Sequence, residues 1–168
     1  MSAAAQPAAA VRLDELLRHN EEEANRWRAF FEAHPQALDV PWQADVADVR
    51  QMVRHIFAVE LLYAETVRGT PRAKITYDDF PCATLDDLFG TGEKARALFR
   101  ETLDSPVDWN EQLRFGTEKW SRIASRRKML LHAQFHSMRH WAQIATGLRQ
   151  AGYKQDWPHD FIFTQVME

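Results

Sequence analysis

The stretch SRRKMLLHAQFHSMRHWAQIATGLRQAG, residues 125–152, predicts a long α-helix. Ser125 is a good N-cap, because a serine side chain can accept a hydrogen bond from a free backbone N–H group of the first turn. Gly152 follows the expected last turn, where glycine commonly ends a helix. Histidines recur within this helix at intervals of four residues, so the same segment bears on both fold and function.

Three further segments have apolar residues at helical spacing with charged residues between them, the pattern of amphipathic helices. They run from about Leu13 to Ala33, from about Asp45 to Arg68, and from Thr84 to about Leu103. Asp45 and Thr84 are the expected N-caps of the second and the third. Pro35 and Pro106 end the first and the third, because the residue before a proline avoids helical geometry. Gly69 follows the second. Gly90 and Gly92 lower the helix propensity of the third segment, so the sequence leaves open whether this helix is kinked or broken there.

The segments between these helices are long. Residues 69–83 are rich in turn-forming residues and predict a loop, and residues 107–123 favour a short hairpin or an irregular crossover. The apolar tail, residues 153–168, is expected to pack back on the helices. No segment alternates strongly with period two. The sequence therefore predicts an all-α protein, a four-helix bundle with long crossover connections.

Composition narrows the class of protein. A chain of 168 residues favours one domain, which we place at residues 11–168, after a disordered leader at residues 1–10. The net charge of -3 argues against nucleic acid as a partner, and the absence of an 18-residue apolar run argues against a membrane span. The single cysteine, Cys82, excludes an internal disulfide and a zinc ribbon. We expect a cytoplasmic protein.

The histidines His132, His136 and His140 lie on one stripe of the last helix, because each step of four residues advances about 400° around the axis and about 6 Å along it. Adjacent members can share one metal ion, but all three cannot easily do so. Spacing leaves open which pair binds. A third ligand must come from another helix, and His55, which lies among apolar residues, is the candidate.

The alternative for each histidine is a structural role. His55 could be a hydrogen-bonded core residue. His132 could be a hydrogen-bond partner of a ligand, a pocket residue or a satisfied core group. His19, His34 and His159 are expected to be surface or loop residues.

These residues resemble the DinB/YfiT-like family of metalloenzymes from about residue 13 to 163. The resemblance is carried by a histidine in the second helix, by H-x-x-x-H in the last helix, and by matching positions at Glu60, Tyr63 and Gln143. It implies a four-helix bundle, commonly dimeric, whose ligands correspond to His55, His136 and His140. The family commonly has a histidine where this chain has Arg139.

Characterised relatives include thiol-dependent isomerases and S-transferases. The resemblance thus implies a divalent-metal-dependent enzyme, a transferase or hydrolase that uses zinc or nickel, a small-molecule substrate and a low-molecular-weight thiol. A bound cation would lower the pKa of a water or thiol and make it a nucleophile near neutral pH. Glu60 could act as an acid or base, although packing or a salt bridge fits its helical position better, and Gln143 could orient a ligand. Arg139 and Arg54 could bind an anion.

Two other classes stay open. In one, a structural metal joins the second and fourth helices of a binding protein. In the other, a dimeric stress-related protein carries buried neutral histidines and no metal.

Overall fold

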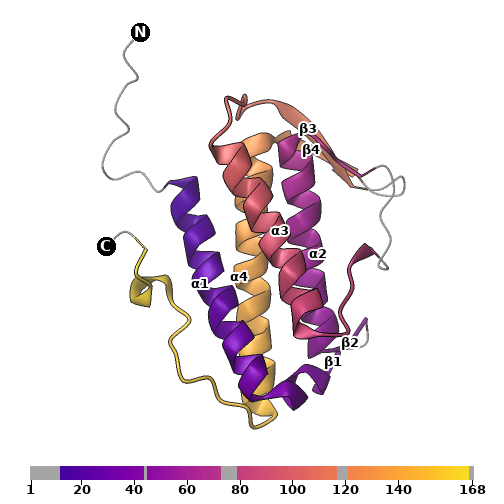
Figure 1. Cartoon of the computed structure of the whole chain (residues 1–168), viewed down its shortest axis with the longest axis vertical. Helices are drawn as coiled ribbons and strands as arrows, with labels where there is room; N and C mark the ends of the chain where they lie inside the picture. Colours follow the sequence, from indigo (N-terminus) through magenta and orange to yellow (C-terminus); the bar gives the residue numbers. More distant parts are fainter. Residues whose placement is uncertain (1–11, 44, 73–78, 117–120, 167–168) are drawn as a thin grey trace.

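Four long helices pack side by side in a bundle, as Figure 1 shows. The computed structural model describes residues 12–43, 45–72, 79–116 and 121–166, so the leader expected at residues 1–10 lies outside the described part. The helices are α1 (Leu13–Ala33), α2 (Val49–Arg68), α3 (Leu85–Leu103) and α4 (Arg126–Gln150). Helix α2 packs against α3 and α4, and α1 packs against the same two helices. The predicted all-α four-helix bundle is confirmed.

Helix ends follow the capping signals in the sequence, with one correction. Thr84 and Ser125 cap α3 and α4 as predicted, and their side chains accept hydrogen bonds from the backbone of the first turn. For α2, the predicted start at Asp45 is wrong. Asp48 is the cap, and its side chain accepts from the backbone N–H of Gln51 at 2.8 Å. The residues before it pair as a short hairpin instead of extending the helix.

This hairpin and a second one are the only strands in the described residues. Strand β1 (Pro41–Gln43) pairs with β2 (Val46–Asp48), and β3 (Gln112–Gly116) pairs with β4 (Ser121–Ser125); both pairs are antiparallel. The second hairpin resolves the alternatives for residues 107–123. The two hairpins lie at opposite ends of the bundle (Figure 1). The described residues include no helix that is long and apolar enough to cross a membrane.

The tail packs back on the bundle, as predicted, over its described residues up to 166. Glu23 of α1 accepts a hydrogen bond from Trp157 Nε1 at 3.2 Å and contacts His159 Nδ1 at 2.6 Å. His159 also stacks on Trp27, with ring centroids 5.5 Å apart. The prediction that His19 lies at the surface is wrong, because the tail covers it and only 4% of it is exposed.

Helix α3 runs unbroken through Gly90 and Gly92, and the space around Gly92 explains why a glycine stands there. A Cβ atom on Gly92 would lie 2.3 Å from Cδ1 of Phe57, a buried ring on α2. A Cβ on Gly90 would meet nothing within 4 Å. Glycine at position 92 therefore lets α2 and α3 pack closely.

We expect Gly92→Ala to lower the free energy of unfolding by about 1–3 kcal/mol, since the added methyl group must displace a packed ring. Gly90→Ala, two residues earlier, is the matched control and should raise stability by about 0.5–1 kcal/mol, because alanine is the better helix former. Urea unfolding followed by circular dichroism measures both. Equal effects of the two changes would contradict the packing argument.

Candidate metal centre

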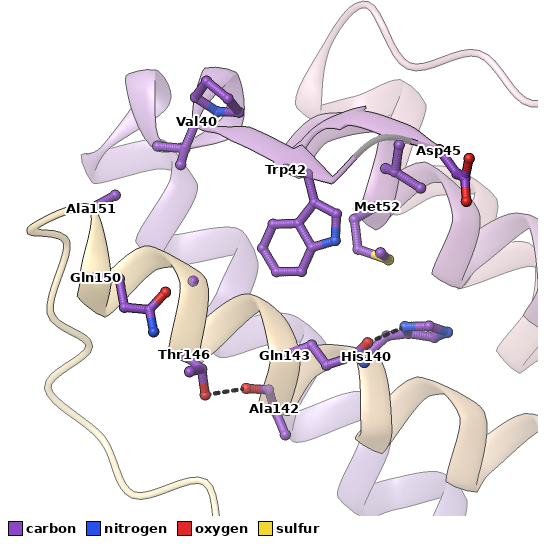
Figure 2. A pocket seen from close by; sticks show the side chains of 13 residues that line it. Val40, Trp42, Asp45, Met52, His140, Ala142, Gln143, Thr146, Gln150 and Ala151 are labelled. Atoms are coloured by element: carbon purple, nitrogen blue, oxygen red, sulfur yellow. Dashed lines mark hydrogen bonds between the residues drawn. The ribbon is translucent and has the colours of Figure 1, made fainter.

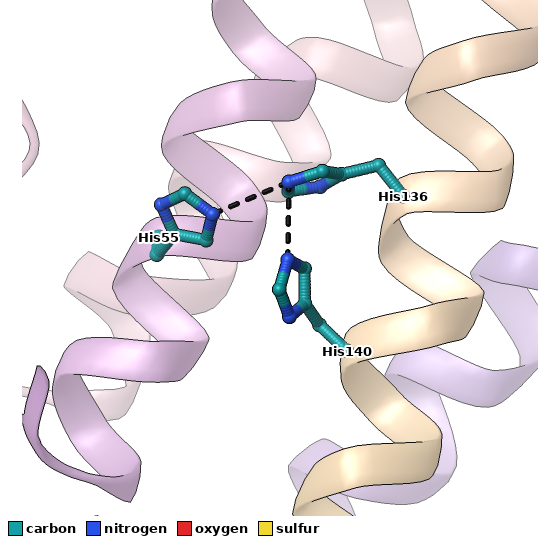
Figure 3. Close-up of side chains that lie close together, drawn as sticks. All are labelled: His55, His136 and His140. Atoms are coloured by element: carbon teal, nitrogen blue, oxygen red, sulfur yellow. Dashed lines mark hydrogen bonds between the residues drawn. The ribbon is translucent and has the colours of Figure 1, made fainter. Parts of the chain in front are cut away.

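Three histidines from two helices converge on one point. His55 comes from the middle of α2, and His136 and His140 come from successive turns of α4 (Figure 3). The Nε2 atom of His136 lies 3.2 Å from Nε2 of His55 and 3.1 Å from Nε2 of His140. One ligand atom from each of the three lies within 4.8 Å of the others. The structure thus brings together the three predicted ligands.

These separations suit a shared cation. Two nitrogens that each lie about 2.1 Å from one ion are about 3.0 Å apart at a right angle and about 3.4 Å apart at the tetrahedral angle. The observed values of 3.1 and 3.2 Å fall in this range. The three histidines could therefore hold one divalent metal ion.

Hydrogen positions lead to the same result. The contact of His140 Nδ1 with Oε1 of Gln143, at 2.7 Å, requires a hydrogen on Nδ1 and leaves the lone pair of neutral His140 on Nε2. His136 Nε2 faces two other imidazole nitrogens but carries at most one hydrogen. Of the contacts that His136 Nε2 makes with His55 and His140, one therefore has no hydrogen between the two nitrogens. A cation that accepts a lone pair from each ring would remove this mismatch.

The protonation state also fits. Burial is the largest cause that lowers the pKa of all three histidines. Together with the neighbouring histidines and Arg139, it takes the pKa of His136 to about 3. Arg139 contributes to each shift. The rings are neutral at pH 7, and the neutral imidazole is the form that binds a metal.

Gln143 fixes the orientation of the His140 ring. This is the orienting role that the sequence allowed for Gln143. The residue lies three positions after His140, and the 2.7 Å contact between them turns Nε2 toward the other histidines. Such a partner sets both the tautomer and the ring direction of a ligand.

We expect Gln143→Leu to weaken metal affinity by about 10–100-fold while a saturating metal concentration still gives full occupancy. The isosteric Gln143→Glu should keep most of the affinity, because a carboxylate also accepts from Nδ1. Competition with a chromophoric chelator measures both variants. An unchanged affinity in Gln143→Leu would show that the contact does not orient the ring.

Glu60 does not join the centre. It is 3% exposed, accepts a hydrogen bond from Ser137 Oγ at 2.6 Å, and pairs with Arg96 of α3 at 3.7 Å. The salt-bridge role favoured by its helical position is confirmed. Burial raises the pKa of Glu60, against the opposing influence of Arg96 and Ser137.

His132 also stays apart from the three. Its side chain is exposed, and its ring centroid lies 6.0 Å from that of His136 and 5.2 Å from that of Tyr63. Tyr63 in turn stacks on Phe115 of β3, with ring centroids 3.8 Å apart. His132 is therefore a neighbour of the site at the next turn of α4.

A groove of about 1120 Å³ opens beside His140 (Figure 2). The β1–β2 hairpin and α2 supply Trp42 and Met52, and α4 supplies the other wall with Gln143 and Gly147. A Cβ atom on Gly147 would lie 2.6 Å from Cζ3 of Trp42, so the glycine lets the indole rest on α4. Sequence reasoning missed this wall, because no local signal shows that Trp42, which lies between the first two helices, packs against α4.

Fold and site together define a helical-bundle protein with a three-histidine site that could hold a divalent metal ion. The sequence profile of the DinB family matches residues 1–165, and the chain belongs to that family. A search of the curated proteins found no match.

Proposed function

We propose that this protein is a divalent-metal-dependent enzyme, with zinc or nickel held by His55, His136 and His140. The observation that carries the proposal is the convergence of three imidazole nitrogens, one of which belongs to His140, a residue that lines the groove. Catalytic zinc sites commonly have three protein ligands and an open position, whereas structural zinc sites are closed by four. Among the described residues, the group that could hold a metal ion has three members.

The reaction that we propose depends on a small thiol. The protein would either transfer the thiol to a second substrate or use it to isomerise that substrate. A bound divalent cation would lower the pKa of a thiol or a water and so supply a nucleophile at neutral pH. The residues of the chain would orient a metal ligand and provide a surface for the substrate. Gln143 holds the ring of His140, while Trp42 and Met52 offer apolar surface to a second substrate in the groove. We also propose that the protein is a cytoplasmic homodimer.

Metal-loaded protein tests this function directly. We expect protein reconstituted with Zn²⁺ or Ni²⁺ to accelerate conjugation of a small thiol with a model electrophile such as 1-chloro-2,4-dinitrobenzene, followed by absorbance. Prior removal of the metal with a chelator should abolish the acceleration, and returning the ion should restore it. A panel of thiols, with cysteine, glutathione, bacillithiol and mycothiol as members, would identify the preferred one.

A thermal melt of the same samples separates an enzyme from a protein with a structural metal. For an open site, metal removal should abolish activity with a modest loss of stability. If chelation unfolds the bundle and no thiol reacts faster in the presence of the loaded protein, the metal has a structural role and the proposed function is wrong.

A further inference from the structure

Arg139 stands beside the three converging imidazole nitrogens. Its Nη2 atom lies 3.1 Å from Nε2 of His140, and in the described part of the chain this nitrogen is its only hydrogen-bond acceptor. Arg139 forms no ion pair with any carboxylate of the described residues. The hydrogen-bond partner of the Arg139 guanidinium is thus Nε2 of His140, whose lone pair a metal ion would also use.

Two charged side chains belong to this region: the guanidinium of Arg139, beside His140, and the carboxylate of Asp45, which lines the groove on the side of the β1–β2 hairpin. Three neutral imidazoles bring no negative charge to a bound cation. Glu60, the buried carboxylate nearest in sequence to His55 on α2, is already paired with Arg96. With a divalent cation in place, the cation and the guanidinium would repel each other unless an anion lay between them.

Arg139 precedes, along α4, the residues that line one wall of the groove. Gln143, Thr146, Gly147 and Gln150 line the α4 side. Arg139 precedes Gln143 by four residues and therefore lies on the same face of the helix, one turn closer to His136. A molecule lying in the groove along Trp42 would reach Arg139 at the end where the histidines converge.

We propose that Arg139 is a substrate-binding residue for a carboxylate, and that the groove takes a small carboxylate whose apolar, flat body lies along Trp42. A guanidinium matches the planar geometry of a carboxylate and forms strong charge-assisted hydrogen bonds with it. The inference rests on the proposed function, because it requires a divalent cation at the three histidines.

The test uses Co²⁺ as the metal and two probes of one shape, benzoate and neutral benzamide. Visible absorption of the Co²⁺ protein reports metal binding and the arrival of a further ligand. In buffer without coordinating anions, we expect Arg139→Met to bind Co²⁺ several-fold more tightly than the wild type, since both a repelling charge and a competitor for the lone pair of His140 are gone. Benzoate should bind that variant about tenfold more weakly or worse.

These two effects have opposite signs, which loss of structure cannot produce. Arg139→Lys should keep much of the benzoate affinity, and Arg127→Met, which removes an exposed arginine near the start of α4, should change neither quantity. Benzamide should bind weakly and equally to all four proteins.

Several results would overturn the inference. If the wild type binds Co²⁺ but binds benzoate no better than benzamide, or if Arg139→Met leaves benzoate affinity unchanged, Arg139 is not a carboxylate-binding residue and the proposed metal-dependent function stands. If the wild type binds no Co²⁺, the inference and the proposed function both fail.

Discussion

Replacement of His136 by alanine is expected to reduce bound Zn²⁺ or Ni²⁺ from about one ion per chain to less than about a tenth of that. His136 is the central member of the group, because its Nε2 contacts Nε2 of both His55 and His140. Without it, two imidazoles from different helices remain, and two ligands hold an ion weakly. Elemental analysis after dialysis against micromolar metal measures the change.

His132→Ala is the matched control, because it removes an imidazole from the same stripe of α4 one turn away. His132 is exposed and lies outside the group of three, so its loss should leave about one ion per chain. Far-ultraviolet circular dichroism should show that both variants keep the helical fold. Full metal content in His136→Ala, or an equal loss in His132→Ala, would refute the assignment of His55, His136 and His140 as ligands.

Loss of the buried charge pair between α2 and α3 should have the largest effect on stability. We expect Arg96→Met to lower the free energy of unfolding by about 3–5 kcal/mol at pH 8, because it leaves the carboxylate of Glu60 buried without its partner. Each side chain of this pair is only 4% exposed. Arg100→Met, one turn further along α3, is the control. Its exposed pair with Glu21 should contribute less than about 1 kcal/mol.

The destabilisation by Arg96→Met should depend on pH. Burial already raises the pKa of Glu60, and removal of Arg96 takes away an influence that lowers it. A carboxyl whose pKa is higher in the folded state than in the unfolded state stabilises the fold most below the unfolded pKa, and that stability is lost as pH rises through the folded pKa. The variant should therefore lie closer to the wild type at pH 5 than at pH 8.

A double variant, Glu60→Leu with Arg96→Met, separates the charge from the packing. It should recover most of the lost stability, since an apolar pair can replace a buried ion pair at little cost. Ser137 would lose Glu60 as an acceptor, but its Oγ also lies 3.1 Å from the carbonyl of Ala133. A double variant as unstable as Arg96→Met alone would show that the loss arises from poor packing.

Some of the candidate site could be predicted from the sequence because the relevant contacts are local. Spacing of four residues places His136 and His140 on one face of a helix, and three residues place Gln143 beside His140. Spacing could not choose between His132 and His140 as the partner of His136. That choice depends on which turn of α4 faces His55 across the bundle, a contact between residues 81 positions apart.

The groove, and Arg96 as the partner of Glu60, lay beyond sequence reasoning for the same reason. Trp42 forms a wall because the β1–β2 hairpin folds it onto Gly147, more than a hundred residues later. The placement of Asp45 as a helix cap failed because a local capping signal cannot reveal that its neighbours pair as strands.

By itself, the sequence determined the four helices, most of their ends and the row of imidazoles on α4, since periodicity and capping act within a few residues. The tertiary structure decided the rest: that His55 meets His136 and His140, that Glu60 pairs with Arg96 instead of reaching the three histidines, and that Trp42 and Gln143 border one groove. Those contacts depend on how α2, α3 and α4 pack against one another, because each joins side chains that are far apart in the chain.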